Sequence, residues 1–178
     1  NVGCIKVKWH RPVDGNIKTV SVTKRNYKWY VLFATEVETK SLPITGKKVG
    51  IDVGLNYFIT CSDGIQIAPP KYLKLSEEKL AKSQRQLSRK KRGSNRRKKS
   101  RVLLARHHEK VANQRLDFCH KTAHSIVQNY DGIAVEKLNI NNMLKSKYLA
   151  KSISDAGWGM FLNILKFKAE NAGRWYTE

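Results

Sequence analysis

The chain has 178 residues, 40% of them hydrophobic, which is enough for one medium-sized domain with a real core. It carries 35 Lys and Arg against 14 Asp and Glu, a formal net charge of +21, and the natural partner of such an excess is nucleic acid. The absence of a run of about 18 apolar residues argues against a membrane-spanning helix, and from the first residues we expect no signal peptide. Three widely spaced cysteines argue against a disulfide framework or a zinc site, so we expect a cytoplasmic protein.

Three segments near the N-terminus alternate apolar and polar side chains and are rich in β-branched and aromatic residues: 4–9, 17–23 and 28–36. This pattern predicts half-buried antiparallel strands. Because three strands alone leave unpaired edges, we expect residues 1–45 to be part of a barrel. The segment 41–46 predicts a linker, and a second domain is expected over residues 46–178.

Residues 49–64, VGIDVGLNYFITCSDG, predict a β-hairpin that turns near Gly54. Asp52 in the middle of its first strand is unusual, because Asp is disfavoured in strands and costly to bury unless it is paired or bound to a cation. Two explanations stay open at this point: Asp52 binds a divalent metal ion, or it accepts backbone hydrogen bonds near a strand end. A short third strand is predicted at 65–68, where two prolines stop it.

Two helices are predicted next, over residues 71–91 and 96–129, and together they should form an antiparallel hairpin. On the first helix, leucines recur every seven residues at Leu73, Leu80 and Leu87, a spacing suited to one partner helix. On the second helix, three-and-four spacing predicts one apolar face, made of Val102, Ala105, Ala112, Leu116, Cys119, Ala123, Ile126 and Tyr130.

The turn between these helices is the most strongly charged part of the chain, with nine basic residues among the thirteen of 89–101 and no acidic one. A charged run is ordinarily a solvated helix face, but solvation does not require a single sign. We therefore expect this turn to lie along phosphates, and its lack of aromatic residues predicts contact with the nucleic-acid backbone rather than the bases. The predicted nucleic-acid-binding residues are Arg89, Lys90, Lys91, Arg92, Arg96, Arg97, Lys98, Lys99 and Arg101.

Residues 132–138 predict a short apolar strand that carries a second carboxylate, Glu136. The long helix before it is the kind of crossover that a parallel pairing needs. A polar loop at 139–151, an amphipathic helix at 155–172 and a strand at 174–177 complete the predicted elements.

This order of elements is that of an α/β, RNase H-like fold with a mixed sheet and an inserted basic helical hairpin. In that fold Asp52 and Glu136 would face each other across adjacent strands. They would hold divalent ions, Mg²⁺ or Mn²⁺, for phosphodiester hydrolysis.

Four motifs occur in the same order as in a known family: GIDVGLNYFITCSDG, QLSRKKRGSNRRKKSR, IAVEKLNI and GWGMFLNILKFKAENAGR. Over about residues 47–178 the chain resembles the TnpB (OrfB) proteins of insertion sequences, which are also called transposases and are related to compact type V CRISPR effectors. The resemblance implies a RuvC-like, RNA-guided DNA endonuclease whose partners are DNA and a guide RNA. It implies Asp52 and Glu136 as the first two RuvC carboxylates, both catalytic and metal-binding. The strands before residue 45 are weakly similar to the end of the family's wedge barrel.

The chain departs from the family pattern in three parts. The family's N-terminal lobe, its third catalytic Asp and its zinc ribbon of Cys-x-x-Cys motifs do not occur within these 178 residues. We therefore expect a C-terminally incomplete nuclease domain, associated with the prokaryotic nucleoid and inactive by itself. The main alternative is a non-catalytic, basic nucleic-acid-binding module in which the two carboxylates are relics. A ribosomal-type structural protein is a more distant one.

Overall fold

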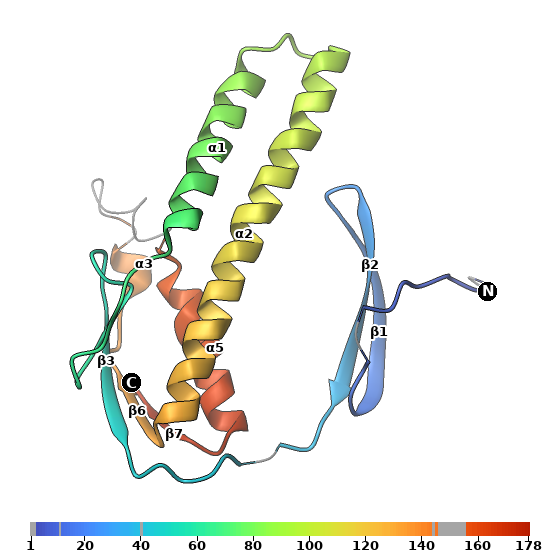
Figure 1. The fold of residues 1–178 in the computed structure, drawn as a ribbon. Coiled ribbons are helices and arrows are strands. Elements are labelled where there is room, and N and C mark those ends of the chain that lie inside the picture. Colours follow the sequence, from blue (N-terminus) through green and yellow to red (C-terminus); the bar gives the residue numbers. More distant parts are fainter. Residues whose placement is uncertain (1–2, 11, 40, 144, 146–155) are drawn as a thin grey trace. The chain divides into compact units, whose positions relative to one another are not determined.

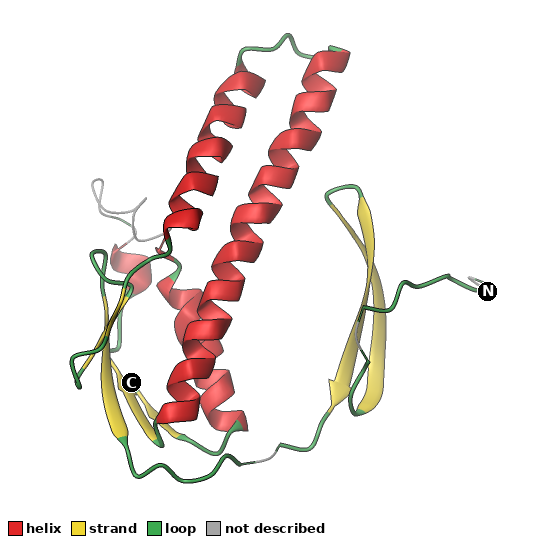
Figure 2. Ribbon diagram, viewed as in Figure 1, coloured by secondary structure: helices red, strands yellow, loops and turns green. Residues whose placement is uncertain are grey.

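The computed structural model describes residues 3–10, 12–39, 41–143, 145 and 156–178 (Figures 1 and 2). The chain divides into two compact units, residues 1–39 and 40–178. The whole of the predicted linker 41–46 belongs to the second unit, where the Leu42 backbone N–H donates to the Ala172 carbonyl at 3.0 Å. The domain boundary at residue 45 and the wedge-like nature of the first segment stay predictions.

The first unit is an antiparallel hairpin of β1 (Asn16–Arg25) and β2 (Lys28–Glu36). The two residues of its turn, Asn26 and Tyr27, both have positive φ angles, 47° and 67°. Such angles match the right-handed twist of the two strands that the turn joins.

The predicted strand at 4–9 is wrong, because these residues form no strand. They contact β2 through a ring instead: Trp9 stacks on Phe33 with the ring centroids 5.3 Å apart. An alternating pattern becomes a strand only where its backbone pairs with the edge of another strand. In the first unit the predicted partial barrel is therefore a two-stranded sheet.

The second unit is built on a five-stranded mixed sheet with the order β5-β4-β3-β6-β7. β3 pairs antiparallel with β4, and β4 with β5, whereas β3–β6 and β6–β7 are parallel pairs. The parallel pairing of β3 with β6 confirms the prediction drawn from the long helical connection. The strands are β3 (Lys48–Val53), β4 (Ile59–Cys61), β5 (Gln66–Ile67), β6 (Gly132–Val135) and β7 (Trp175–Thr177).

The helical hairpin consists of α1 (Lys71–Ser88) and α2 (Asn95–Asn129), which run side by side beyond the sheet (Figure 1). α2 begins at Ser94, whose hydroxyl accepts a hydrogen bond from the Arg97 backbone N–H at 3.2 Å, as a helix N-cap does. Within the described part of the chain, no helix is both long enough and apolar enough to cross a membrane.

The last helix is α5 (Trp158–Asn171), and it ends in a Schellman arrangement. Gly173 has a φ angle of 67° and donates its N–H to the Glu170 carbonyl, while the Arg174 N–H returns to the Ala169 carbonyl at 2.8 Å. A single helical turn, α3 (Ile140–Met143), falls in the predicted loop 139–151, most of which lies outside the described residues.

The core lies between the sheet and the two helices α2 and α5, which pack against it (Figure 2). Burying large apolar side chains between these layers is the main favourable contribution to folding. The largest fully buried side chains are Phe161, Ile59, Ile133, Leu165 and Cys119.

The apolar face predicted for α2 is wrong in its distal half. Ala112 and Leu116 are exposed, whereas Leu104 and Val111 are buried. The reason is that α1 is the one described helix beside this half of α2 (Figure 1), so the buried positions follow the seven-residue spacing of a two-helix seam.

Polar side chains occupy several positions along this seam between α1 and α2. The hydroxyl of Ser83 lies 2.7 Å from Nδ1 of His107, and Arg115 forms a part-buried ion pair with Glu77 at 3.1 Å. Polar groups in a helix seam satisfy one another in one register only, so they specify how the helices align.

Replacing Phe161 by Ala should lower the free energy of unfolding by about 3–5 kcal/mol, because Phe161 is fully buried and its removal leaves a cavity. The matched control is Phe167→Ala on the same helix, since Phe167 is 66% exposed and its loss should cost little. Urea unfolding followed by circular dichroism measures both variants. Equal losses would contradict the assignment of the core face of α5.

Candidate functional site

Asp52 and Glu136 are brought together by the parallel pairing of β3 with β6. The last paired residues of this ladder are Ile51 and Val135, and each acidic residue follows its paired neighbour by one position. Neighbouring strands lie about 4.8 Å apart, so we expect the two backbone positions to be close, although Glu136 lies one residue past the end of β6. Both acidic residues are exposed.

The carboxylate of Asp52 does not bear the burial cost that its strand position suggested. Ile51, the residue before it, is 4% exposed and packs in the core, and alternation along the strand turns Asp52 to the opposite face. Its oxygens therefore stay accessible to water or to a ligand. Within the described residues no group of three or more His, Cys, Asp and Glu side chains could hold a metal ion. The sheet thus presents a pair of carboxylates rather than a complete set of metal ligands.

The basic turn, residues 89–101, comprises the connection between α1 and α2 and the first residues of α2, at the far end of the hairpin (Figure 1). Two of its nine predicted nucleic-acid-binding residues serve the hairpin itself. Arg97 donates from one guanidinium nitrogen to the carbonyls of Leu87 and Lys90, both at 2.9 Å, and Lys90 donates to the Ser100 hydroxyl. The other seven are exposed and make no ion pair with a described residue: Arg89, Lys91, Arg92, Arg96, Lys98, Lys99 and Arg101.

A part-buried charge cluster, which the sequence reasoning missed, lies where three strands begin. The Asp131 carboxylate accepts hydrogen bonds from the backbone N–H groups of Thr45 and Gly46, at 2.9 and 2.6 Å, and pairs with Arg174 at 2.5 Å. These backbone hydrogen bonds, first of all that of Thr45, and then the nearby guanidinium lower the pKa of Asp131. One feature of the sequence could have indicated this cluster: Arg174 directly follows the helix-ending Gly173 and directly precedes a strand.

A second carboxylate is tied to the end of α2. The Tyr130 hydroxyl donates to Asp63 in the turn between β4 and β5. This hydrogen bond raises the pKa of Tyr130 to about 12 and lowers the pKa of Asp63. Asp63 therefore has a structural partner, unlike the exposed Asp52.

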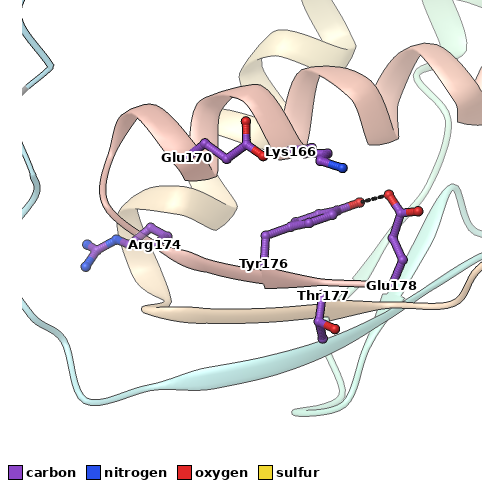
Figure 3. A pocket seen from close by; sticks show the side chains of 6 residues that line it. All are labelled: Lys166, Glu170, Arg174, Tyr176, Thr177 and Glu178. Atoms are coloured by element: carbon purple, nitrogen blue, oxygen red, sulfur yellow. Dashed lines mark hydrogen bonds between the residues drawn. The ribbon is translucent and has the colours of Figure 1, made fainter.

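A polar pocket of about 450 Å³ lies between α5 and β7. Figure 3 shows Tyr176 donating to Glu178 inside it, while the guanidinium of Arg174 points away from both. Burial raises the pKa of Tyr176. Neither Asp52 nor Glu136 lines this pocket, so the pocket and the carboxylate pair are separate features of the sheet.

Comparison with known proteins decides the family. The sequence profile of the OrfB_IS605 family, described as "Probable transposase", matches residues 32–147. The chain belongs to this family. The match includes β3, the whole helical hairpin and β6, and hence both Asp52 and Glu136.

Individual proteins similar to this chain support the same family assignment. The chain is 35% identical over 173 residues to a "Putative RNA-guided DNA endonuclease" of Streptomyces pristinaespiralis, covering 96% of this chain and 43% of the relative. It is 33% identical to the "Putative RNA-guided DNA endonuclease InsQ" of Escherichia coli K12, covering 94% and 46%. A "TnpB-like protein" of Acanthamoeba polyphaga mimivirus is 29% identical, with 83% and 30% covered. The chain thus spans less than half the length of these curated relatives.

Arg97→Gln should destabilise the helical hairpin, because it removes the hydrogen bonds to the Leu87 carbonyl in the last turn of α1 and to the Lys90 carbonyl just beyond it. Hydrogen bonds that involve a charged group contribute about 1.5–3 kcal/mol, so we expect a loss near the lower end for this part-buried side chain. Arg96→Gln is the matched control, since Arg96 is the exposed neighbour and should cost little. Thermal unfolding of the two variants makes the comparison, and equal stability would refute the internal role of Arg97.

Proposed function

We propose that residues 46–178 form the first part of an RNase H-like, RuvC-type nuclease domain of the OrfB family. In this proposal Asp52 and Glu136 are two of its catalytic, metal-binding carboxylates. The observation that carries the proposal is the register of β3 and β6: Ile51 pairs with Val135, and an exposed acid follows each of them by one position. The strand order, with β3 central and antiparallel only to β4, supports the same assignment.

The donor chemistry of this pair fits a hard divalent cation such as Mg²⁺ or Mn²⁺. Both groups offer carboxylate oxygens, which these ions prefer, and both are exposed. When bound, the cation would activate water and stabilise the leaving oxygen in phosphodiester hydrolysis. The protein's part is to hold the two carboxylates at a fixed separation on rigid strands.

In this proposal the helical hairpin is the surface that binds nucleic acid. Residues 71–121 hold 18 Lys and Arg against four Asp and Glu, so they carry +14 of the net charge of +21. The seven exposed side chains of the basic turn would contact phosphates, and the relatives' names suggest DNA and a guide RNA as the polyanions.

A non-catalytic nucleic-acid-binding module is the second candidate. Its support is that no third acidic, His or Cys ligand joins Asp52 and Glu136 among the described residues. We therefore propose that these 178 residues by themselves bind nucleic acid and cleave it poorly. For the first unit we propose a wedge-like role, since Val20, Val22 and Trp29 on its hairpin are about half exposed or more and suit further barrel strands.

Mn²⁺ binding tests the carboxylate pair directly. The chain should bind one Mn²⁺ in electron paramagnetic resonance titrations, and Asp52→Ala and Glu136→Ala should each weaken binding by about tenfold or more, because each removes one of two charged ligands. Glu78→Ala removes an exposed acid of α1 and should change nothing. Identical affinities in all four proteins would refute the proposed metal site.

The same preparations separate the two candidate functions. With labelled single-stranded DNA and millimolar Mg²⁺ or Mn²⁺, we expect little cleavage by these 178 residues, since a misplacement of about 1 Å can cost a hundredfold in rate. Robust cleavage that disappears in Asp52→Ala would show that a further ligand lies within the chain. The proposal of poor cleavage would then be wrong.

The exposed side chains of the basic turn should account for much of the salt dependence of DNA binding. Replacing Arg89, Arg92, Arg96 and Lys99 by Gln should reduce the slope of log affinity against log salt by up to about 3–4, at about 0.9 for each lost duplex phosphate contact. Arg97 is left intact because it stabilises the hairpin. The control removes the same charge elsewhere, by replacing Lys74, Lys79, Lys137 and Lys166 with Gln. If both variants bound alike in filter-binding assays, the turn would be an ordinary solvated face.

A further inference from the structure

The relative position of Asp52 and Glu136 depends on the register of β3 against β6, and the core fixes this register only partly. Val49 and Ile51 of β3 are 3% and 4% exposed, so a slip of one residue would turn these side chains out of the core. A slip of two residues keeps every side chain on its own face. It would, however, move Asp52 by about 6.6 Å along the strand, away from Glu136.

Asp131 links the beginning of β6 to the segment that precedes β3. Its carboxylate accepts the N–H groups of Thr45 and Gly46, and its own N–H donates to the Lys47 carbonyl at 2.7 Å. Residues 45–47 directly precede β3, and Asp131 directly precedes β6. Asp52 and Glu136 each follow this junction by five positions, counted from Lys47 and from Asp131. The hydrogen bonds between Asp131 and residues 45–47 therefore align the two strands at equal distances from the two acidic residues.

Arg174 holds Asp131 in this position. Its side chain is only 3% exposed, and besides pairing with Asp131 it donates to the carbonyls of Val127 and Pro43, at 3.1 and 3.0 Å. The Trp175 N–H donates in turn to the Asp131 carbonyl at 2.8 Å, so β7 starts from the same residue. A carboxylate held from both sides in this way cannot follow a slipped β3 without breaking several charge-assisted hydrogen bonds.

We propose that Asp131 and Arg174 are positioning residues that prevent a two-residue slip of β3 against β6 and so keep Asp52 beside Glu136. This inference rests on the proposed function, in which those two acids form the metal site. Asp131 and Arg174 act only through the strands that they align.

Disulfide trapping measures the register without any metal ion. The parent protein carries Cys4→Ser, Asp52→Cys and Glu136→Cys, and diamide oxidises the two introduced thiols. In the native register the two Cα atoms lie within disulfide range, whereas a two-residue slip separates them by about 8 Å, beyond the roughly 7 Å limit. Peptide mapping identifies the bridge and excludes pairing with the buried Cys61 and Cys119.

Adding Asp131→Ala to the parent should slow formation of this bridge by about tenfold or more, because the register is no longer held within disulfide range. Asp131→Asn keeps one acceptor oxygen and should restore part of the rate. Glu77→Gln is the matched control: it removes the other part-buried ion pair, in the helical hairpin, and should leave trapping unchanged. Circular dichroism shows which variants stay folded, and if Asp131→Ala unfolds, Asp131→Asn and Arg174→Lys decide the question.

The outcomes separate the two proposals. If the parent itself forms no bridge, the acids are not adjacent, and both the proposed metal site and the positioning role are wrong. If the parent forms the bridge and the folded Asp131 and Arg174 variants form it equally fast, the positioning role alone is refuted. Slower trapping in these variants but not in Glu77→Gln supports it.

Discussion

The buried guanidinium of Arg174 is the constraint on which the second unit depends. A charge that is almost fully removed from water costs several kcal/mol unless it is paired and hydrogen-bonded. Arg174 meets this requirement through Asp131 and the carbonyls of Val127 and Pro43. These partners come from the end of α2, the start of β6 and the segment before β3, so one side chain ties together parts of the chain that are distant in sequence. Gly173 makes this possible, because its left-handed backbone turns the chain from α5 into β7.

The helical hairpin combines two roles in one insertion between β5 and β6. As a connection, it is long enough to bring β6 alongside β3 in the parallel direction. As a surface, residues 71–121 carry +14 of the net charge of +21, and the seven outward side chains of the basic turn are exposed. The interface between α1 and α2 contains polar pairs that set the alignment of the two helices. In the turn, Arg97 and Lys90 make hydrogen bonds within the hairpin. The basic composition of the turn therefore serves folding as well as the proposed binding of phosphates.

The proposed site uses the face of the sheet that the core does not occupy. Helices α2 and α5 cover one face, and strand alternation leaves Asp52 on the other. Exposed carboxylates keep their hydration, which suits groups that would exchange water for a cation. Rigidity comes from Ile51 and Val135, the buried partners that precede the two acids in the ladder.

Much of this molecule follows from the sequence by itself. Composition and the single sign of the charged run predict a polyanion partner, and hydrophobic spacing predicts both long helices, the hairpin 49–64 and the apolar strand before Glu136. That strand is shorter than predicted, because it ends at Val135 and does not include residues 136–138. These features are local, since periodicity and turn residues act over a few positions. The order of the elements also predicts the parallel pairing of β3 with β6, and four motifs identify the family. Only the tertiary structure decided which face Asp52 occupies, that residues 4–9 form no strand, and which basic side chains stay exposed. Each of these depends on what packs against a residue from elsewhere in the chain. The contact of Arg174 with Asp131, 43 positions apart, is of the same kind. No local pattern records it, because its physical cause is the need of a buried charge for a partner.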